Sequence, residues 1–278
     1  PNGAGKTTAL KIIAGLTRPD SGEVLINGKA LQPHSSLQRD QIGFLAQEPR
    51  YYPWMTGREL LEFTARLFGF RGSELKKRVG ELLELSGLGK AAERRLGGYS
   101  GGMIQRLGIA QALCHRPGLL ILDEPASALD PVGRREVLEL IAQLGQETTV
   151  FFSTHILDDV ERICQDIAIL KEGKIILAGE RRSVLEDHAP AQMMIELAGQ
   201  RLSEFKLDDA SQANEDSSLS PGQFVLPLEQ WKRQQSEILA QIDRLSLQVE
   251  SITRHKASLE DLFLKLVGGK EGHNEQTS

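Results

Sequence analysis

The first eight residues, PNGAGKTT, constrain the fold of this chain more than any other segment. They match the phosphate-binding pattern G-x-x-x-x-G-K-[ST] except for its first glycine, which would stand one position before Pro1. Gly3 and Gly5 let the backbone curl so that its N–H groups face a phosphate, and a helix expected over 6–14 adds its positive end. The alternative is a polar, glycine-rich turn before a helix. The opening of the chain therefore favours a nucleotide-binding α/β protein.

A loop of this kind is aimed by a strand that precedes it, and the chain as given has no residues there. We therefore expect an N-terminally truncated fragment. Within the loop, Lys6 would reach the β- and γ-phosphates, Thr7 would supply a hydroxyl ligand to Mg²⁺, and Thr8 would help to hold the phosphates. The other nucleotide contacts expected in the loop are Asn2, Gly3, Ala4 and Gly5.

Two carboxylates, Asp123 and Glu124, end a short apolar run at 119–122. Such a run is typical of a strand buried on both faces of a parallel sheet, and ligands bind at the carboxyl ends of these strands. Asp123 can hold Mg²⁺ there, and Glu124 can poise a water molecule against the γ-phosphate as a general base. The alternative is a solvated acidic turn before Pro125. The phosphate loop upstream favours the catalytic interpretation.

Three more polar residues follow predicted strands. His155 ends a strand expected over 148–154, at the same sheet edge as Glu124, where its imidazole could bind a γ-phosphate or the attacking water. A lone histidine is more often structural, but this position favours function. Gln47 lies where another predicted strand breaks into a loop, and Asp130 follows the paired carboxylates.

A second anion site is predicted at the start of a helix expected over 104–115. Ser100 is well placed to cap this helix, and Gly101 and Gly102 leave its backbone accessible. In isolation a Ser-Gly-Gly segment is merely a turn. Here it lies between the phosphate loop and the paired carboxylates, which is a specific order.

The phosphate loop, SGG at 100–102 and LDEP at 122–125 together resemble the nucleotide-binding subunit of ATP-binding cassette (ABC) transporters. Matching segments run in the family's order from Pro1 to a strand pair expected over 167–179. The resemblance implies an α/β P-loop NTPase fold of the ABC ATPase type, with a parallel sheet core and a helical subdomain. It also implies ATP and Mg²⁺ as ligands and ATP hydrolysis as the reaction.

The resemblance further implies a role for each matching position. Nucleotide binding is implied for Asn2, Gly3, Ala4, Gly5, Lys6, Thr7, Thr8, Ser100, Gly101, Gly102 and Asp130. Mg²⁺ binding is implied for Thr7, Gln47 and Asp123, and catalysis for Glu124, His155 and Gln47. In the family, the Ser-Gly-Gly signature closes on ATP held by a second subunit. We therefore expect two copies of the chain to sandwich two ATP molecules head to tail.

Two features depart from the family's pattern. Tyr99 and Met103 stand where the signature usually has Leu and Gln. Because the serine and glycines that would contact ATP remain, this variation is tolerable. The family also places an adenine-stacking aromatic in its N-terminal sheet, so a truncated chain would bind ATP poorly or fold incompletely.

The expected layout follows from the motifs and from composition. The ATPase domain would span 1–190, with its helical subdomain at about 48–115. A polar, acidic linker would occupy 191–222, a small α+β extension 223–268, and a disordered tail 269–278.

Partners are implied by what the chain lacks and by how it ends. No apolar stretch approaches the roughly 20 residues that span a bilayer. The resemblance therefore implies a separate transmembrane permease, with this chain on the cytoplasmic face of the cell membrane. The ending SLEDLF at 258–263 resembles the extension of ABC-2 drug and antibiotic exporters, although a dimer-packing helix is equally consistent. A further cluster predicts either a permease contact or internal core: Tyr51, Tyr52, Trp54 and Met55.

Composition excludes other classes. Cys114 and Cys164 are the only cysteines, too few for a disulfide framework or a thiolate metal cage. The net charge of −5 argues against nucleic acid as a partner. Three alternatives to an exporter subunit stay open: a non-transport ABC ATPase, an importer subunit, and a catalytically impaired fragment that only binds a partner.

Overall fold

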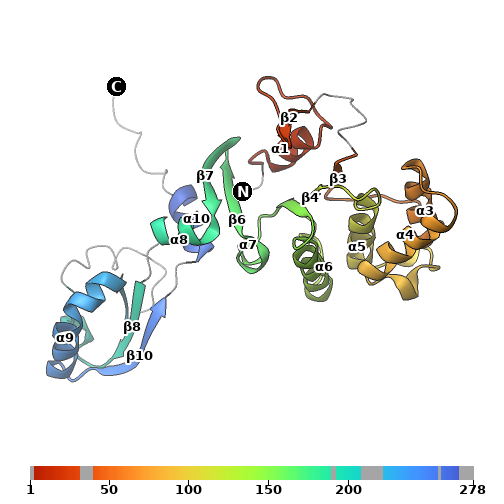
Figure 1. Cartoon of the computed structure of the whole chain (residues 1–278). Coiled ribbons are helices and arrows are strands. Elements are labelled where there is room, and N and C mark those ends of the chain that lie inside the picture. The colour runs from red at the N-terminus through yellow and green to blue at the C-terminus, as the bar shows by residue number, and fades with distance from the viewer. Residues whose placement is uncertain (1–2, 32–39, 189–191, 208–221, 256–257, 269–278) are drawn as a thin grey trace, which may run out of the picture. The chain divides into compact units, whose positions relative to one another are not determined.

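The computed structural model describes residues 3–31, 40–188, 192–207, 222–255 and 258–268 (Figure 1). The chain divides into two compact units, which we describe separately. The first contains residues 1–164 and 168–177, and the second contains 165–167 and 178–278. The first unit thus ends before the boundary at 190 that we expected from the sequence.

A three-stranded parallel sheet lies at the centre of the first unit. Its strands are β3 (Ile42–Leu45), β4 (Leu119–Asp123) and β5 (Thr149–Ser153), in the order β3-β4-β5. The middle strand is the apolar run expected from the sequence, and Leu120 and Ile121 are fully buried. The expected parallel sheet is therefore present.

Both faces of this sheet are covered. Ile121 packs against Leu10 and Ala14 from α1 (Lys6–Ile13) and its C-terminal end. Leu120 and Leu122 point the other way, into the larger core. That core includes residues of α5 (Gly101–Ala112) and α6 (Pro131–Leu144). Burial on both faces explains why β4 is apolar from Leu119 to Leu122.

Helices fill the segment between β3 and β4. They are α3 (Gly57–Leu67), α4 (Gly72–Leu85), the 3-10 turns η1 (Gly89–Ala91) and η2 (Leu96–Gly98), and α5. Thr56 and Glu59 form a capping box at the start of α3, in which each side chain bonds the other residue's backbone N–H. The periodic apolar residues of these helices pack with the sheet into one core.

The remaining elements of the first unit, and the two strands that cross its boundary with the second unit, are short. The hairpin β1 (Leu25–Ile26) and β2 (Lys29–Ala30) turns at Asn27-Gly28, where both residues have positive φ. The helix α7 (Leu157–Ile163) follows β5. The strands β6 (Asp166–Lys171) and β7 (Lys174–Glu180) pair with each other, which is the strand pair expected over 167–179.

The second unit is built on an antiparallel sheet of order β10-β8-β9, packed against one long helix. Its elements are α8 (Arg181–His188), β8 (Gln192–Ala198), η3 (Leu202–Glu204), β9 (Gln223–Pro227), α9 (Leu228–Arg244), β10 (Gln248–His255) and α10 (Leu259–Gly268). The unit thus combines helices with an antiparallel sheet.

The expected linker over 191–222 is wrong for its first part. Residues 192–198 form β8, the central strand of the second sheet. Met193, Ile195 and Leu197 alternate with more exposed neighbours, a period-2 pattern that the acidic composition downstream concealed. Most of the remaining linker, 208–221, and the tail at 269–278 lie outside the described residues.

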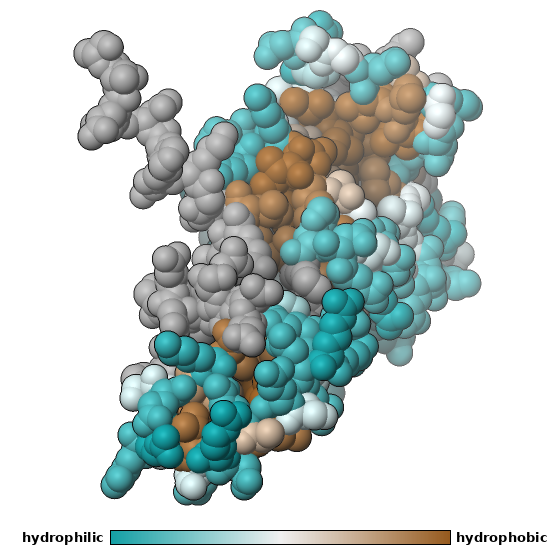
Figure 2. Space-filling model, turned by 90° about the vertical axis from the view of Figure 1, so that its left-hand side faces the viewer, coloured by the Kyte–Doolittle hydropathy of each residue, from teal (hydrophilic) through white to brown (hydrophobic). Residues whose placement is uncertain are grey.

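Part of the molecular surface is hydrophobic. Figure 2 shows one face on which hydrophobic surface gathers in a broad area beside strongly polar surface. Leu25, Phe151 and Ile175 are among the large apolar side chains of the first unit that are well exposed. Within the described residues, no helix is both long enough and apolar enough to cross a membrane.

Candidate active site

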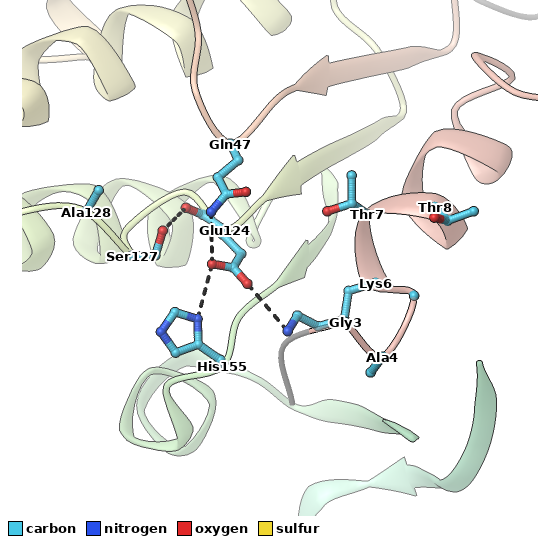
Figure 3. Close-up of a pocket in the computed structure, with 11 residues that line it drawn as sticks. Gly3, Ala4, Lys6, Thr7, Thr8, Gln47, Glu124, Ser127, Ala128 and His155 are labelled. Atoms are coloured by element: carbon cyan, nitrogen blue, oxygen red, sulfur yellow. Dashed lines mark hydrogen bonds and ion pairs between the residues drawn. The ribbon is translucent and has the colours of Figure 1, made fainter. Parts of the chain in front are cut away.

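A cavity of about 630 Å³ lies in the first unit, between the start of α1 and the carboxyl ends of the parallel strands (Figure 3). Its lining residues are Gly3, Ala4, Gly5, Lys6, Thr7, Thr8, Gln47, Glu124, Ser127, Ala128 and His155. Nine of them were expected from the sequence as site residues. Asn2 lies outside the described residues.

The loop at the start of the chain forms one wall of the cavity. Gly3 and Gly5 have φ of 75° and 97°, a left-handed region that glycine adopts without strain. Gly5 is the N-cap of α1, and the first turn of this helix contains no acidic residue. The positive end of α1 is therefore left for an anion.

Glu124 lies opposite this loop and is the centre of the polar contacts. Its Oε1 is 3.4 Å from Lys6 Nζ, and its Oε2 accepts a hydrogen bond from Gln47 Nε2 at 3.3 Å (Figure 3). The same Oε2 is 3.1 Å from His155 Nδ1. Because an ionised carboxylate only accepts hydrogen bonds, this contact places the imidazole proton on Nδ1 and directs Nε2 elsewhere. Three side chains from distant parts of the sequence thus contact one carboxylate.

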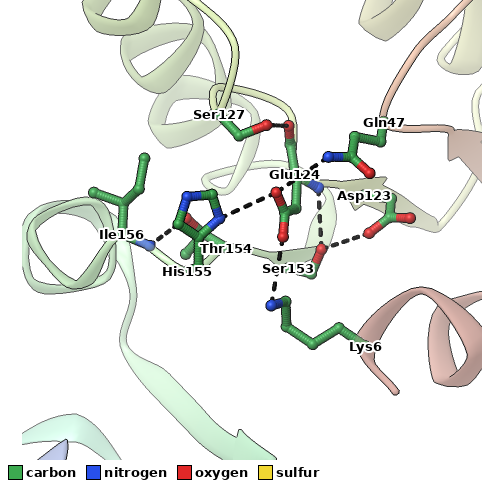
Figure 4. Close-up of polar contacts among 9 residues, drawn as sticks. All are labelled: Lys6, Gln47, Asp123, Glu124, Ser127, Ser153, Thr154, His155 and Ile156. Carbon is green, nitrogen blue, oxygen red and sulfur yellow. Dashed lines mark hydrogen bonds and ion pairs between the residues drawn. The ribbon is translucent and has the colours of Figure 1, made fainter. Parts of the chain in front are cut away.

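Two serines that the sequence interpretation missed hold the backbone of Glu124 (Figure 4). The Glu124 N–H donates to Ser153 Oγ at 3.0 Å, and Ser127 Oγ donates to the Glu124 carbonyl at 3.1 Å. Ser153 Oγ also donates to Asp123 Oδ1 at 2.7 Å. Ser153 lies directly opposite Asp123 in the parallel register of β4 and β5, which no local sequence signal reveals.

Asp123 is not among the residues that line the cavity, and it is almost fully buried. Together with the Thr7 hydroxyl and the side-chain carbonyl of Gln47, its carboxylate offers oxygen ligands, which suit Mg²⁺. Within the described residues, no group of three or more His, Cys, Asp or Glu side chains could hold a metal by itself.

Gln105 of α5 connects this site to the helical segment. Its Nε2 donates to the backbone carbonyl of Gln47 at 3.0 Å, so α5 holds the loop that carries Gln47. Gln105 itself is buried, and its Oε1 has no hydrogen-bond partner among the residues that the structure describes. The sequence interpretation did not single out this residue.

The other expected site residues form a separate cluster. Ser100 caps α5 by accepting from the Met103 N–H at 3.3 Å, so the helix begins at Gly101 rather than at 104. Asp130 caps α6 by accepting from the Gly133 N–H at 2.9 Å. A Cβ on Gly102 would lie 3.1 Å from the Cα of Gly133, so the two helix starts pack closely. The residues of this cluster that the sequence singled out, none of which lines the cavity, are Ser100, Gly101, Gly102 and Asp130.

The unusual Tyr99 has a structural role. Its hydroxyl donates to the Ala91 carbonyl at 2.7 Å, and burial raises the pKa of its phenol. Tyr99 therefore holds the 3-10 turn η1, and the neighbouring Ser100 still caps α5. Met103 packs against the main core.

The expected aromatic cluster is split between core and surface. Tyr51 and Met55 pack against the core. Tyr52 and Trp54 are 61% and 64% exposed, with ring centroids 4.8 Å apart. Half of the cluster is thus internal core, and an exposed aromatic pair remains near Gln47 in sequence.

Comparison with known proteins identifies relatives for most of the chain. A family model described as "ABC transporter" matches residues 1–127. The uncharacterized ABC transporter ATP-binding protein YxlF of Bacillus subtilis (strain 168) is 41% identical over 267 residues, which cover 96% of this chain and 88% of that protein. The bacitracin transport ATP-binding protein BcrA of Bacillus licheniformis is 33% identical over 278 residues, covering 96% of this chain and 86% of that protein.

A solved structure agrees with these relatives. The ATP-binding cassette MJ0796, in a dimeric post-hydrolysis state bound to ADP and Pi, is 31% identical with a TM-score of 0.57. The match covers 65% of this chain and 82% of that chain.

Proposed function

The chain belongs to the ABC transporter family as an ATP-binding subunit, and from this premise we propose that it powers a membrane exporter through ATP-driven closure of a dimer. Members of this family are P-loop ATPases, so ATP hydrolysis is the reaction.

One observation carries the proposal. A single cavity has the phosphate loop on one wall and Glu124, Gln47 and His155 on the other. The first wall offers backbone N–H groups, a helix start and one lysine, all suited to phosphates. The second wall offers a carboxylate, an amide and an imidazole, which suit a water molecule beside the terminal phosphate.

On the first wall, the amides of Gly3 to Gly5 would bind the phosphates, and Lys6 would pair with the β- and γ-phosphates. Thr8 would add a hydroxyl contact. Since Lys6 now pairs with Glu124, ATP would draw the lysine away and leave the carboxylate available.

Thr7, Asp123 and Gln47 would hold Mg²⁺, which neutralises phosphate charge when it is bound. The amide orientation supports this set, because Gln47 donates to Glu124 through Nε2 and so keeps its carbonyl oxygen for another ligand. Asp123 would be held in place by its bond to Ser153.

On the second wall, Glu124 would accept a proton from the water that attacks the γ-phosphorus. The bond between the γ-phosphorus and the bridging oxygen breaks, and ADP and phosphate leave. His155 would orient the attacking water or the γ-phosphate while it remains close to Glu124. Positioning and charge stabilisation, rather than covalent chemistry, would supply most of the acceleration.

Dimer closure would complete each site. Ser100, Gly101 and Asp130 belong to a cluster separate from the cavity, as expected of groups that serve the ATP of a second copy. The similar cassette MJ0796 is dimeric in its post-hydrolysis state. We propose a head-to-tail homodimer that closes on two ATP molecules and opens after hydrolysis.

A separate permease would receive this motion. Tyr52 and Trp54 form an exposed aromatic pair, five and seven positions after Gln47, suited to contact a membrane-embedded partner. Peripheral attachment to the cytoplasmic face of the cell membrane would follow. The relative BcrA is named for bacitracin transport, which supports export of a drug-like molecule as the cargo.

The test is Mg²⁺-dependent release of phosphate from ATP by this chain, alone and with a candidate permease in lipid vesicles. We expect hydrolysis that Glu124→Gln removes, and ATP-dependent movement of the cargo out of the cytoplasmic compartment. Hydrolysis without movement in that direction would contradict the exporter part. Hydrolysis unaffected by Glu124→Gln would contradict the site.

A further inference from the structure

Ser153 is the last residue of β5, and its hydroxyl bonds the Asp123 carboxylate and the backbone of Glu124. Its hydroxyl lies 2.7 Å from Asp123 Oδ1 and 3.0 Å from the backbone nitrogen of Glu124 (Figure 4). Its own carbonyl also accepts from the Glu124 N–H, at 3.2 Å. The side chain is more than nine-tenths buried, so water cannot easily replace these bonds.

The direction of each bond follows from the chemistry of a serine hydroxyl, which has a single proton to donate. The Glu124 N–H can only donate, so Ser153 Oγ must accept from it. The hydroxyl proton is then available for Asp123, which accepts it on Oδ1. Figure 4 shows the second oxygen of Asp123 turned away from Ser153. One hydroxyl therefore orients the Asp123 carboxylate and anchors the next residue.

The anchored residue has an unfavourable backbone. Glu124 has φ of 46°, in the left-handed region that non-glycine residues avoid. Such a conformation persists only where the surroundings hold it, and at functional sites it aims a side chain. Ser153 holds the N–H of Glu124 and Ser127 Oγ holds its carbonyl. The turn that points Glu124 into the cavity thus depends on these hydroxyls.

We propose that Ser153 is a positioning residue, which couples the metal-binding orientation of Asp123 to the catalytic orientation of Glu124. This inference rests on the proposed function, in which these two carboxylates hold Mg²⁺ and activate water. Removing the hydroxyl releases the Asp123 carboxylate to rotate and leaves Glu124 with the longer bond to the Ser153 carbonyl. Hydrogen bonds to metal ligands of this kind change metal affinity or activity by about 10- to 100-fold when they are lost.

The experiment compares Ser153→Ala with Ser153→Thr in the full chain. Threonine keeps the hydroxyl, and its branched side chain suits a strand. Ser86→Ala is the matched control, because Ser86 is also buried and its hydroxyl donates to the Leu82 carbonyl at 2.7 Å, within the helical segment. We measure kcat, KM for ATP, and the thermal midpoint. Electron paramagnetic resonance gives Mn²⁺ affinity in the presence of ADP, a readout that needs no hydrolysis.

For Ser153→Ala we expect kcat to fall about 10- to 100-fold and Mn²⁺ binding to weaken by a similar factor. KM for the Mg²⁺–ATP complex should rise with the weaker metal binding, whereas ATP affinity measured without a divalent cation should stay within about twofold, because the phosphate loop is intact. Ser153→Thr should recover most of both losses, and Ser86→Ala should show neither.

Three results would overturn the inference. The first is a Ser153→Ala variant whose kcat and Mn²⁺ affinity equal those of the unmodified chain. The second is equal losses in Ser86→Ala, which would indicate general destabilisation. The third is a folded Ser153→Thr that recovers nothing. If instead Glu124→Gln hydrolyses ATP normally, the proposed function fails, while the Mn²⁺ affinities still decide whether Ser153 orients Asp123.

Discussion

Lys6 Nζ lies 3.4 Å from Glu124 Oε1, so the lysine of the phosphate loop is paired with the carboxylate that follows β4. Both side chains are largely buried, at 17% and 9% exposure, and water screens the pair weakly. The pair spans the cavity in which we place ATP. In the proposed function, a nucleotide would compete with Glu124 for the lysine, so that nucleotide binding would also free the carboxylate.

Glu124→Gln tests the carboxylate. Glutamine has nearly the same shape but cannot accept a proton from water, so we expect ATP binding to remain. We expect kcat to fall about 100-fold or more, the usual worth of a general base. The ATP-bound dimer should accumulate, which light scattering after gel filtration detects. Glu93→Gln is the control, because Glu93 is exposed and pairs with Arg58. Normal turnover in Glu124→Gln would remove it as the base.

Lys6→Ala tests the phosphate loop. Charged hydrogen bonds contribute about 1.5–3 kcal/mol each, so nucleotide affinity should fall by about 10- to 100-fold. A fluorescent ATP analogue titrated into the chain measures this. Lys11→Ala, on the exposed side of the same helix, should bind normally. Unchanged affinity in Lys6→Ala would exclude the loop as the phosphate site.

Much of the site could be predicted because its residues belong to short motifs, each of which carries a local signal. The apolar run before Asp123 indicates a buried strand, and the glycines before Lys6 indicate a loop with positive φ. Such features depend on local physical chemistry. The sequence predicts that Lys6 and Glu124 lie near the same nucleotide, but it does not predict the ion pair between them. That contact depends on how α1 packs on β4.

Other features depend on register and could not be predicted. Ser153 reaches Asp123 because β5 pairs with β4 in one particular register. Gln105 holds Gln47 across 58 positions of sequence, from a helix that shows only amphipathic periodicity. The strand at 192–198 was missed because the acidic stretch after it outweighed its own alternation. Local composition is a poor guide where tertiary packing decides.

Gly43→Ala tests the packing of β3 against α5. A Cβ at this position would press directly against the carbonyl of Ala112 and lie 3.1 Å from Leu120 Cδ1. Since a backbone carbonyl in a helix cannot move aside cheaply, the free energy of unfolding should fall by about 1–3 kcal/mol. Urea denaturation followed by circular dichroism measures the change.

The control for Gly43→Ala is Gly118→Ala. Gly118 has nothing within 4 Å of its Cβ position, so alanine there should change stability by no more than about 0.5 kcal/mol. Equal stability of the two variants would contradict the close packing of β3 on α5.

We expect His115 to make the first unit sensitive to acid. Its ring stacks on Phe68 with centroids 4.2 Å apart, and Nε2 bonds the Ile42 carbonyl at 3.2 Å. Burial lowers the pKa of His115 below its ordinary value of 6.5, outweighing the opposing effects of the Ile42 bond and Asp40. Nδ1 is buried, with no hydrogen-bond partner in the described part of the chain. The folded protein therefore favours the neutral ring.

The sign of the pH effect follows from this shift. Well above pH 6.5 the ring is neutral in both states and the stability is fully present. As pH falls below 6.5, the unfolded chain binds a proton that the folded chain resists, so the free energy of unfolding decreases by up to about 1.4 kcal/mol per pH unit. His115→Gln should flatten this dependence in urea denaturation between pH 6.5 and lower values. An unchanged slope in His115→Gln would show that another group causes the acid sensitivity.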